Sequence, residues 1–265
     1  MVVSWSSGRI EGIWTVRSVI RLAAVAAGAW ALTLAGSGGL SAAAVAPSIL
    51  DPVVASVQPT SGEIVGVGHP VIVTFNGPVA NRRAAERTIK VMSPGRPTGH
   101  FDWVSDSVVQ WVPDNYWPAH SHVAIEVHGL STGFETGSAV LGVADVNAHT
   151  FTVSVDGEVL RTMPASMGKP SRPTPRGSFT ALEKQRTVTF DSRTIGIPLS
   201  SSEGYLIQGQ YAVRVTWGGV YVHSAPWSVD SQGYANVSHG CINLSPDNAA
   251  WYFDTVHIGD PIIVQ

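Results

Sequence analysis

Short segments in which apolar and polar residues alternate, separated by glycine, proline and asparagine, dominate the sequence from Asp51 onward. Alternation with a period of two is typical of strands with one buried face, and turn residues at this spacing favour antiparallel sheets. Charged residues make up 13% of the chain, against ~25% in an average protein. The pattern therefore predicts a mostly β protein. The clearest early strands are HPVIVTF (His69–Phe75), TIKVM (Thr88–Met92), SVVQWV (Ser107–Val112) and HVAIEVHGL (His122–Leu130).

These strands predict a small antiparallel sandwich over residues 47–129. Residues 130–149 are rich in glycine, serine and threonine, which favours a linker. A second β-rich domain is expected over residues 150–265. We find no internal repeat.

One segment near the end of the chain, SPDNAAWYFDTV, has the signals of a helix. Ser245 is placed to cap it, Pro246 fits the first helical position and Asp247 falls in the first turn. The second domain is thus expected to contain one short helix near its C-terminus. The residues expected to face the sheet are Ala250, Trp251 and Phe253.

The first 46 residues resemble an export signal or membrane anchor. Arg9, Arg17 and Arg21 precede the apolar run Leu22–Leu34, and small residues follow it. This order is typical of a secretory signal, and the run is shorter than the roughly 20 residues of a membrane span. Cleavage after Ala44 is favoured over an uncleaved anchor. We therefore expect an exported protein of the cell envelope, secreted or membrane-anchored.

Charge argues against nucleic acid as a partner. The chain has 16 basic and 19 acidic residues, and removing residues 1–44 takes away three arginines and one glutamate. The remaining chain has 13 basic and 18 acidic residues and so a net charge of −5. No basic stripe of the kind that binds nucleic acid is visible.

The chain contains one cysteine, Cys241, in the stretch VSHGCIN. Exported proteins usually pair their cysteines in disulfides, and one cysteine can form no internal bridge. It is then a buried small hydrophobe, a bridge between chains or a nucleophile. A nucleophilic thiol needs a neighbouring base. Two histidines are candidates, His239 two residues earlier and His223 in GVYVHSAPW.

HSAPW followed by SHGCIN resembles the signature of the L,D-transpeptidase (YkuD-type) catalytic domain. The upstream stretch ASMGKPSRPTPRGSF, residues 165–179, is similar to a strand and turn of that family. Together these motifs cover most of residues 150–265. Residues 51–129 resemble the bacterial immunoglobulin-like domain that precedes the catalytic domain in actinobacterial-type members.

The resemblance implies roles for the residues around the cysteine. Cys241 would be the nucleophile that forms a thioester, and His223 would be the general base. The backbone carbonyl of Ser224 would orient that base in place of a carboxylate. His239 and Gly240 would shape the loop that presents the thiol, with backbone N–H groups, including that of Cys241, stabilising the oxyanion.

The resemblance also implies substrate contacts. The segment 181–219 would form a flap over the site, Tyr205 would reach the reacting carbonyl and Trp227 would form a wall of the entrance. Asn243 would brace the cysteine loop. Ile195 departs from the family pattern, since close relatives can have an aromatic residue there.

Each of these residues also has a structural explanation. His223, His239 and Cys241 are residue types that bind zinc, but the chain has neither a C-x-x-C pair nor an H-E-x-x-H motif. PTPRG alone is typical of a rigid turn. The combination of thiol, histidines and export signal favours catalysis without metal or cofactor.

Three hypotheses remain for the function, and the first two are what the resemblance to L,D-transpeptidases implies. The first is a peptidoglycan L,D-transpeptidase that takes a tetrapeptide stem as donor, releases D-alanine and uses the diamino acid of a second stem as acceptor, giving a 3→3 cross-link. β-Lactams of the carbapenem type would acylate Cys241. The second is an L,D-carboxypeptidase, in which water is the acceptor. The third is a wall-binding protein with an inactive C-terminal domain.

Overall fold

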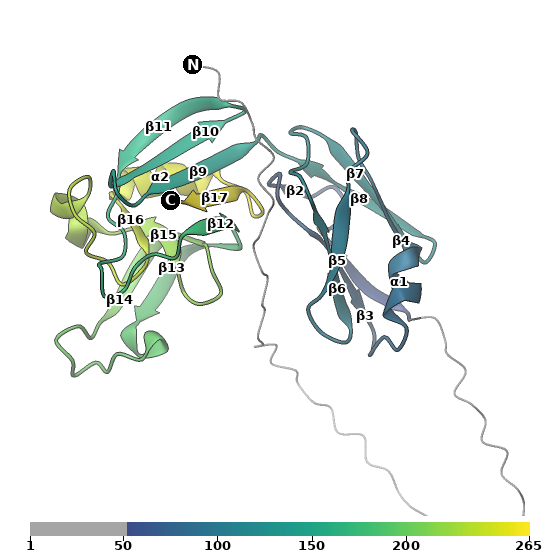
Figure 1. Ribbon diagram of the computed structural model, residues 1–265, viewed down its shortest axis with the longest axis horizontal. Helices are drawn as coiled ribbons and strands as arrows, with labels where there is room; N and C mark the ends of the chain where they lie inside the picture. Colours follow the sequence, from purple (N-terminus) through teal and green to yellow (C-terminus); the bar gives the residue numbers. More distant parts are fainter. Residues whose placement is uncertain (1–51) are drawn as a thin grey trace, which may run out of the picture.

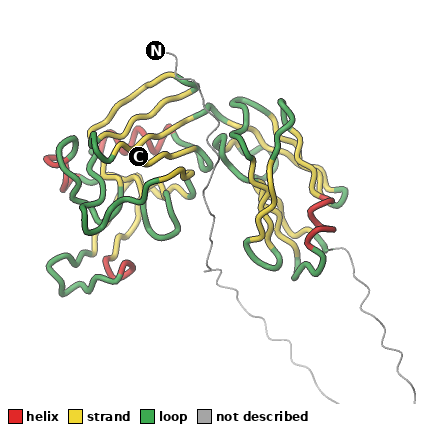
Figure 2. The backbone as a smooth tube through the Cα atoms, in the orientation of Figure 1, coloured by secondary structure: helices red, strands yellow, loops and turns green. Residues whose placement is uncertain are grey.

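The computed structural model describes residues 52–265, which form two β-rich domains side by side (Figure 1). The predicted export segment, residues 1–46, lies outside the described residues. No helix within residues 52–265 is long and apolar enough to cross a membrane. Figure 2 shows how little of the described chain is helical.

The N-terminal domain is a sandwich of two four-stranded sheets. One sheet has the order β1-β3-β6-β5, and all of its pairings are antiparallel. The other has the order β2-β8-β7-β4, with only β2 and β8 parallel. The strands are β1 (Val54–Gln58), β2 (Ile64–Val65), β3 (Val71–Phe75), β4 (Ile89–Met92), β5 (Gly99–Trp103), β6 (Val108–Pro113), β7 (His122–Val127) and β8 (Leu130–Thr136).

Alternation in the sequence explains the core of this sandwich. Val71, Val73 and Phe75 are buried on β3, while the residues between them are only partly buried. Val123 and Ile125 on β7 are fully buried in the same way and belong to the same apolar cluster. The predicted sandwich is therefore confirmed.

The C-terminal domain is built from two further sheets. A five-stranded sheet has the order β11-β10-β9-β17-β12, and a four-stranded sheet has the order β13-β14-β15-β16. The strands of the first are β9 (Val140–Asp145), β10 (Thr150–Val155), β11 (Glu158–Pro164), β12 (Gly177–Thr180) and β17 (Pro261–Val264). Those of the second are β13 (Glu183–Asp191), β14 (Leu206–Arg214), β15 (Tyr221–Ser224) and β16 (Ile242–Leu244).

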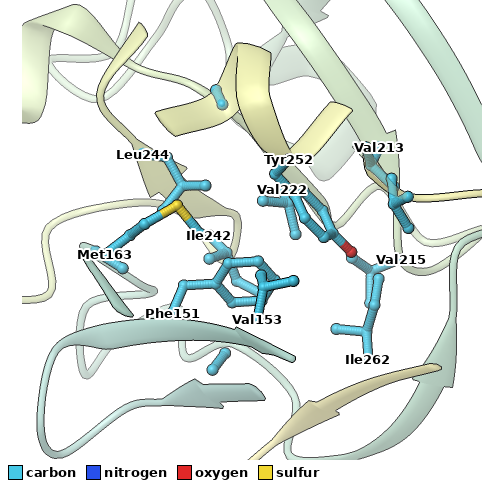
Figure 3. Close-up of a cluster of buried hydrophobic side chains, with 14 of the residues drawn as sticks. Phe151, Val153, Met163, Val213, Val215, Val222, Ile242, Leu244, Tyr252 and Ile262 are labelled. Carbon is cyan, nitrogen blue, oxygen red and sulfur yellow. The ribbon is translucent and has the colours of Figure 1, made fainter. Parts of the chain in front are cut away.

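Side chains from both sheets and from α2 (Pro246–Thr255) meet in one core (Figure 3). Phe151 on β10 packs edge-on against Tyr252 on α2, with ring centroids 4.8 Å apart. Val222 and Ile242, on the neighbouring strands β15 and β16, are fully buried in the same cluster. This packing holds one face of β15 and β16 against the core, and the opposite face carries polar residues.

The predicted helix is confirmed, but its buried face is one residue out of register. The Ser245 side chain accepts a hydrogen bond from the N–H of Asn248, and Pro246 opens the helix. The buried residues are Ala249 and Tyr252, whereas the sequence predicted Ala250 and Phe253. A shift of one residue rotates the buried stripe by about 100°. Trp251 and Phe253 are only partly buried against the core.

The prediction of a linker over residues 130–149 was wrong. Residues 130–149 contain β8, which pairs with β7 from Leu130 to Glu135, and β9, which lies between β10 and β17. Only residues 137–139 join the two domains without belonging to a strand. Phe134 and Val140, inside the supposed linker, are buried in the cores of the two domains.

Three shorter helices complete the described chain and were not expected. They are α1 (Arg82–Thr88), η1 (Ser192–Ile195) and η2 (Pro226–Ser231), of which the last two are 3₁₀ turns. Asn81 caps α1 by accepting a hydrogen bond from the N–H of Ala84.

The two domains are joined by backbone hydrogen bonds as well as by the chain. Gly66 N–H donates to the carbonyl of Ile258 at 2.8 Å, and Gly68 N–H donates to that of Gly259 at 2.9 Å. The buried carboxylate of Asp260 accepts from the N–H of Val67. A Cβ on Gly66 would overlap the backbone of Asp260, so the contact requires glycine there.

A Gly66→Ala variant is expected to open this junction. Overpacking of this kind costs about 1–3 kcal/mol, and each kcal/mol lowers Tm by about 2–4 °C in a protein of this size. Thermal melting and proteolysis within residues 137–139 measure the effect. Gly77→Ala is the matched control, because a Cβ on Gly77 meets no atom within 4 Å. Equal melting and equal cleavage of the two variants would contradict the prediction.

Candidate active site

Two parallel strands bring the cysteine and the buried histidine together. On β15 and β16, Val222 pairs with Ile242 and His223 pairs with Asn243. Cys241 immediately precedes β16. Because side chains alternate along a strand and paired residues point to the same face, His223 and Cys241 are diagonal neighbours on one face. Both line the same pocket.

The His223 ring has a defined tautomer. Its Nδ1 lies 2.8 Å from the carbonyl oxygen of Ser224, which only accepts hydrogen bonds, so Nδ1 carries the proton. Nε2 is then the basic nitrogen. Burial lowers the pKa of His223 to about 4, an effect that the hydrogen bond to Ser224 partly opposes. The ring lies 4.5 Å from the ring of Phe190 and 5.9 Å from that of Trp227.

Cys241 follows Gly240, whose backbone conformation only a residue without a side chain adopts easily. Gly240 has φ +123°, a conformation that L side chains rarely adopt. The hydroxyl of Ser238 donates to the carbonyl of Cys241 at 2.7 Å and accepts from the N–H of Gly240 at 3.1 Å. This pair of bonds closes the loop that presents the thiol.

The thiol itself is protonated at rest. Its residue is partly exposed, and Sγ lies 3.7 Å from the carbonyl oxygen of Gly219. Burial of the sulfur raises the pKa of Cys241 to about 11, with a backbone contact to Tyr221 acting in the opposite direction. With His223 at about 4, the resting pair is a neutral thiol beside a neutral imidazole. Attack by this sulfur would therefore require transfer of its proton to a base such as the imidazole.

A pocket of about 880 Å³ surrounds this pair. Its walls include Tyr205, Tyr221 and Trp227, and Trp227 has 53% of its surface exposed. A cavity of this size is of the order that encloses a small ligand or a few residues of a peptide. Aromatic walls beside a nucleophile and a base can hold an acyl group and restrict access of water.

The segment expected to be a flap is a hairpin with an irregular tip. Residues 183–191 and 206–214 pair as β13 and β14, and residues 192–205 form the tip. Tyr205 lies at the end of this tip with its ring 5.2 Å from that of His239. Burial, and next the proximity of Cys241, raise the pKa of Tyr205. Ile195 also lines the pocket from the tip.

The remaining predicted residues lie near the thiol, with two differences in detail. The N–H of Gly240 is occupied by Ser238, so it is not a free oxyanion donor. Asn243 donates from Nδ2 to the hydroxyl of Ser228 at 3.2 Å, so it braces η2 as well as the strand after the cysteine. Ser228 and Asn243 are both buried.

Two bracing residues were not assigned by the sequence. Ser238 closes the cysteine loop, as described above. Thr174 accepts from the N–H of Gly168 and donates to the carbonyl of Gly240, which ties the PTPRG turn to the same loop. Both stand in motifs that the sequence singles out, and the tendency of serine and threonine hydroxyls to bond nearby backbone groups in turns is the signal that points to such a brace.

Among residues 52–265, no group of three or more His, Cys, Asp or Glu side chains has an arrangement that could hold a metal ion. His239 instead lies beside Lys169 and Glu203. The chemistry that this arrangement supports is nucleophilic attack by sulfur with a histidine base.

Comparison with known proteins identifies the family. Residues 140–264 match the L,D-transpeptidase catalytic domain (YkuD), and residues 43–131 match the bacterial Ig domain. L,D-transpeptidase 1 of Mycobacterium tuberculosis strain ATCC 25618 / H37Rv is 63% identical over 249 residues, covering 94% of this chain and 99% of that protein.

Solved structures agree with this match. An LD transpeptidase in complex with imipenem is 69% identical, with a TM-score of 0.77 over 81% of this chain and 99% of that chain. L,D-transpeptidase 3 from Mycobacterium tuberculosis, in complex with a faropenem-derived adduct, is 52% identical, with a TM-score of 0.75 over 80% and 98%. The chain belongs to the L,D-transpeptidase family, with an immunoglobulin-like domain ahead of the catalytic domain.

Proposed function

We propose that this protein is an exported enzyme that forms 3→3 cross-links in peptidoglycan through a thioester on Cys241. The observation that carries the proposal is the neutral thiol and imidazole pair in one pocket, with the imidazole oriented by the carbonyl of Ser224. Such a pair needs no metal, cofactor or carboxylate to act as nucleophile and base.

The first half of the reaction transfers the donor peptide to sulfur. The Cys241 thiol attacks the carbonyl of the third residue of a tetrapeptide stem while Nε2 of His223 takes the thiol proton. The C–S bond forms and the C–N bond to D-alanine breaks, and His223 passes its proton to the departing amine. The oxyanion formed on the way requires nearby N–H donors, for which the N–H of Cys241 is the proposed group.

The second half releases the product and restores the thiol. The side-chain amine of the diamino acid of a second stem attacks the thioester, and a new amide bond replaces the C–S bond. The amine loses a proton to Nε2 of His223, and that proton returns to the departing sulfur. Water in place of the amine would give a carboxypeptidase.

β-Lactams of the carbapenem type are proposed as covalent inhibitors of the same sulfur. Two related transpeptidases, similar over four fifths of this chain, have been solved with imipenem and with a faropenem-derived adduct. Attack of the thiol on the strained lactam carbonyl follows the same course as attack on the donor. The C–N bond that breaks lies within the ring, so the released nitrogen stays tethered to the acyl group on the enzyme.

The masses of the products show whether the acceptor is an amine or water. The soluble part, residues 47–265, is incubated with a disaccharide-tetrapeptide, and both the protein and the peptides are weighed. We expect a transient adduct on the protein, free D-alanine and a cross-linked dimer that lacks one D-alanine. Tripeptide without dimer would instead establish the carboxypeptidase, and an absence of both products from folded protein would contradict both enzyme functions.

A further inference from the structure

Three segments far apart in the sequence meet beside the pocket. They are the turn of residues 168–174, the flap tip of residues 192–205 and the cysteine loop of residues 237–241. The turn is fixed to the cysteine loop by its backbone, because Ser238 N–H donates to Met167 and Lys169 N–H donates to Ser238. Lys169 is thereby held next to His239.

The flap tip is closed on itself by hydrogen bonds around Ser192. The N–H of Ser192 donates to the carbonyl of Tyr205 at 2.9 Å, and the Ser192 hydroxyl accepts from the N–H of Tyr205 at 3.0 Å and donates to the carbonyl of Ile197 at 2.9 Å. Ser192 is fully buried. A tip tied in this way moves as one unit, so its position depends on the contacts that join it to the rest of the domain.

Besides the β13–β14 hairpin itself and the packing of Tyr205 on His239, charged side chains make such contacts. Lys169 Nζ donates to a carboxylate oxygen of Glu203, in the flap tip, and lies 3.4 Å from Nε2 of His239. The second carboxylate oxygen of Glu203 lies 3.8 Å from the same Nε2. Arg172 adds a weaker bond from Nη1 to the carbonyl of Ile195 at 3.3 Å.

The charge states of these groups agree with the geometry. The hydrogen bond from Lys169 lowers the pKa of Glu203, which keeps the carboxylate ionised. Burial, and next the positive charge of Lys169, lower the pKa of His239. A neutral imidazole accepts at Nε2, which suits its place beside the Lys169 ammonium. The Lys169 side chain is 22% exposed and that of Glu203 is 46% exposed, so water screens the pair in part.

We propose that the Lys169–Glu203 ion pair is a latch that holds the flap tip against the cysteine loop, which makes Lys169 and Glu203 positioning residues for acylation of Cys241. The inference rests on the proposed function for the reaction that it assists. The latch keeps Tyr205 over the pocket, since Tyr205 is two residues from Glu203 and packs against His239. Neither latch residue takes part in bond making.

The test is a double-mutant cycle with a charge swap. Lys169→Gln and Glu203→Gln remove one charge each, and Lys169→Glu with Glu203→Lys restores an ion pair of reversed direction. The first readout, amide hydrogen exchange of residues 192–205 in the free enzyme, requires no substrate. The second is the rate constant for acylation by imipenem, followed by intact mass. The two readouts separate a failure of the latch from a failure of the proposed chemistry.

Each single neutralisation is expected to speed exchange of the flap tip and to slow acylation by about threefold to tenfold. The double neutralisation should be no worse than either single variant, because one interaction has been removed, and the swap should return both readouts to within about twofold of the original. The single variants should also raise KM for the tetrapeptide more than they lower kcat. High salt should reduce the difference between the original and the single variants.

Lys90→Gln and Glu126→Gln are the matched controls. Lys90 and Glu126 form an ion pair across two strands of the immunoglobulin-like domain and should change neither readout. Single variants with unchanged flap exchange, or with effects on acylation that multiply in the double variant, would overturn the latch. A swap that recovers neither readout would also overturn it, because each side chain would then act by itself.

Discussion

Alanine in place of Cys241 is expected to abolish the acyl-enzyme and every cross-linked product, a fall of about 10⁵-fold or more in turnover. The sulfur is the only thiol in the chain, so no other cysteine can replace it. The neighbouring hydroxyl, that of Ser238, already donates to the carbonyl of Cys241 and accepts from Gly240. A hydroxyl committed to two loop bonds is poorly placed to become the nucleophile.

The same substitution should leave the fold intact. The thiol contributes only weak contacts, to the carbonyl of Gly219 at 3.7 Å and to the backbone of Tyr221, and alanine needs no more room than cysteine. The cost in stability is expected to be about 1 kcal/mol or less. Thermal melting checks the fold, and intact mass after incubation with imipenem or with the tetrapeptide checks the chemistry. Cross-links formed by the folded alanine variant would show that the sulfur is not the nucleophile.

How far the sequence alone predicts this structure depends on the range of the interactions involved. The helix near the C-terminus is encoded locally, because Ser245 caps it and Pro246 opens it, and both features were predicted. Its buried face was misplaced by one residue, since the partner sheet decides the rotation of a helix. The capped helix α1 was missed because its seven residues are too few to show a periodic apolar face.

The linker prediction failed for a related reason. Glycine, serine and threonine are typical of loops, and residues 130–149 are rich in them. Pairing with β7 nevertheless places Phe134 in the core of the sandwich, and pairing with β10 and β17 places Val140 in the core of the second domain. Composition reports local preference, and long-range pairing outweighs it here.

The site also combines features that the sequence indicates with contacts that depend on long-range packing. The resemblance placed His223, Ser224 and Cys241, and the hydrogen bond between the ring of His223 and the carbonyl of Ser224 has the form that the family implies. The contact of Lys169 with Glu203 joins residues 34 positions apart through a flap whose tip has no regular strand. No local pattern encodes such a contact, so only the structure reveals it.

Asparagine in place of His223 is expected to slow acylation of Cys241 by about 10²- to 10⁴-fold, the usual contribution of a general base. Asparagine retains an N–H donor for the carbonyl of Ser224 but has no basic nitrogen. The variant therefore removes the proton acceptor while keeping the contact that orients the side chain. Acylation by imipenem, measured by intact mass against time, gives the rate constant.

The pH dependence of the original enzyme provides a second measure of the same group. Burial lowers the pKa of His223 from 6.5 to about 4, so the imidazole stays neutral and able to accept a proton at all pH values above about 4. Acylation should hold steady between neutral pH and about pH 5 and fall as the pH drops through about 4. A fall centred near 6.5 would mean that His223 is not held in the neutral form.

Stability should follow the same group with a definite sign. The folded pKa of His223 lies below the unfolded value of 6.5, so the unfolded chain binds a proton first as the pH falls. The contribution of the neutral imidazole to stability is complete above about pH 6.5 and is lost as the pH falls toward 4. His223→Asn should remove this part of the acid sensitivity, which melting between pH 7 and pH 4 measures.

His69 offers a matched control for both effects. Its Nδ1 lies 2.7 Å from the carbonyl oxygen of Pro70, the next residue, and burial lowers the pKa of His69 as it does that of His223. His69→Asn should therefore reduce acid sensitivity in the same direction while leaving acylation unchanged, because His69 lies in the immunoglobulin-like domain. Equal acylation rates for the His223→Asn and His69→Asn proteins would remove His223 from the role of base, since only His223 shares a pocket with Cys241.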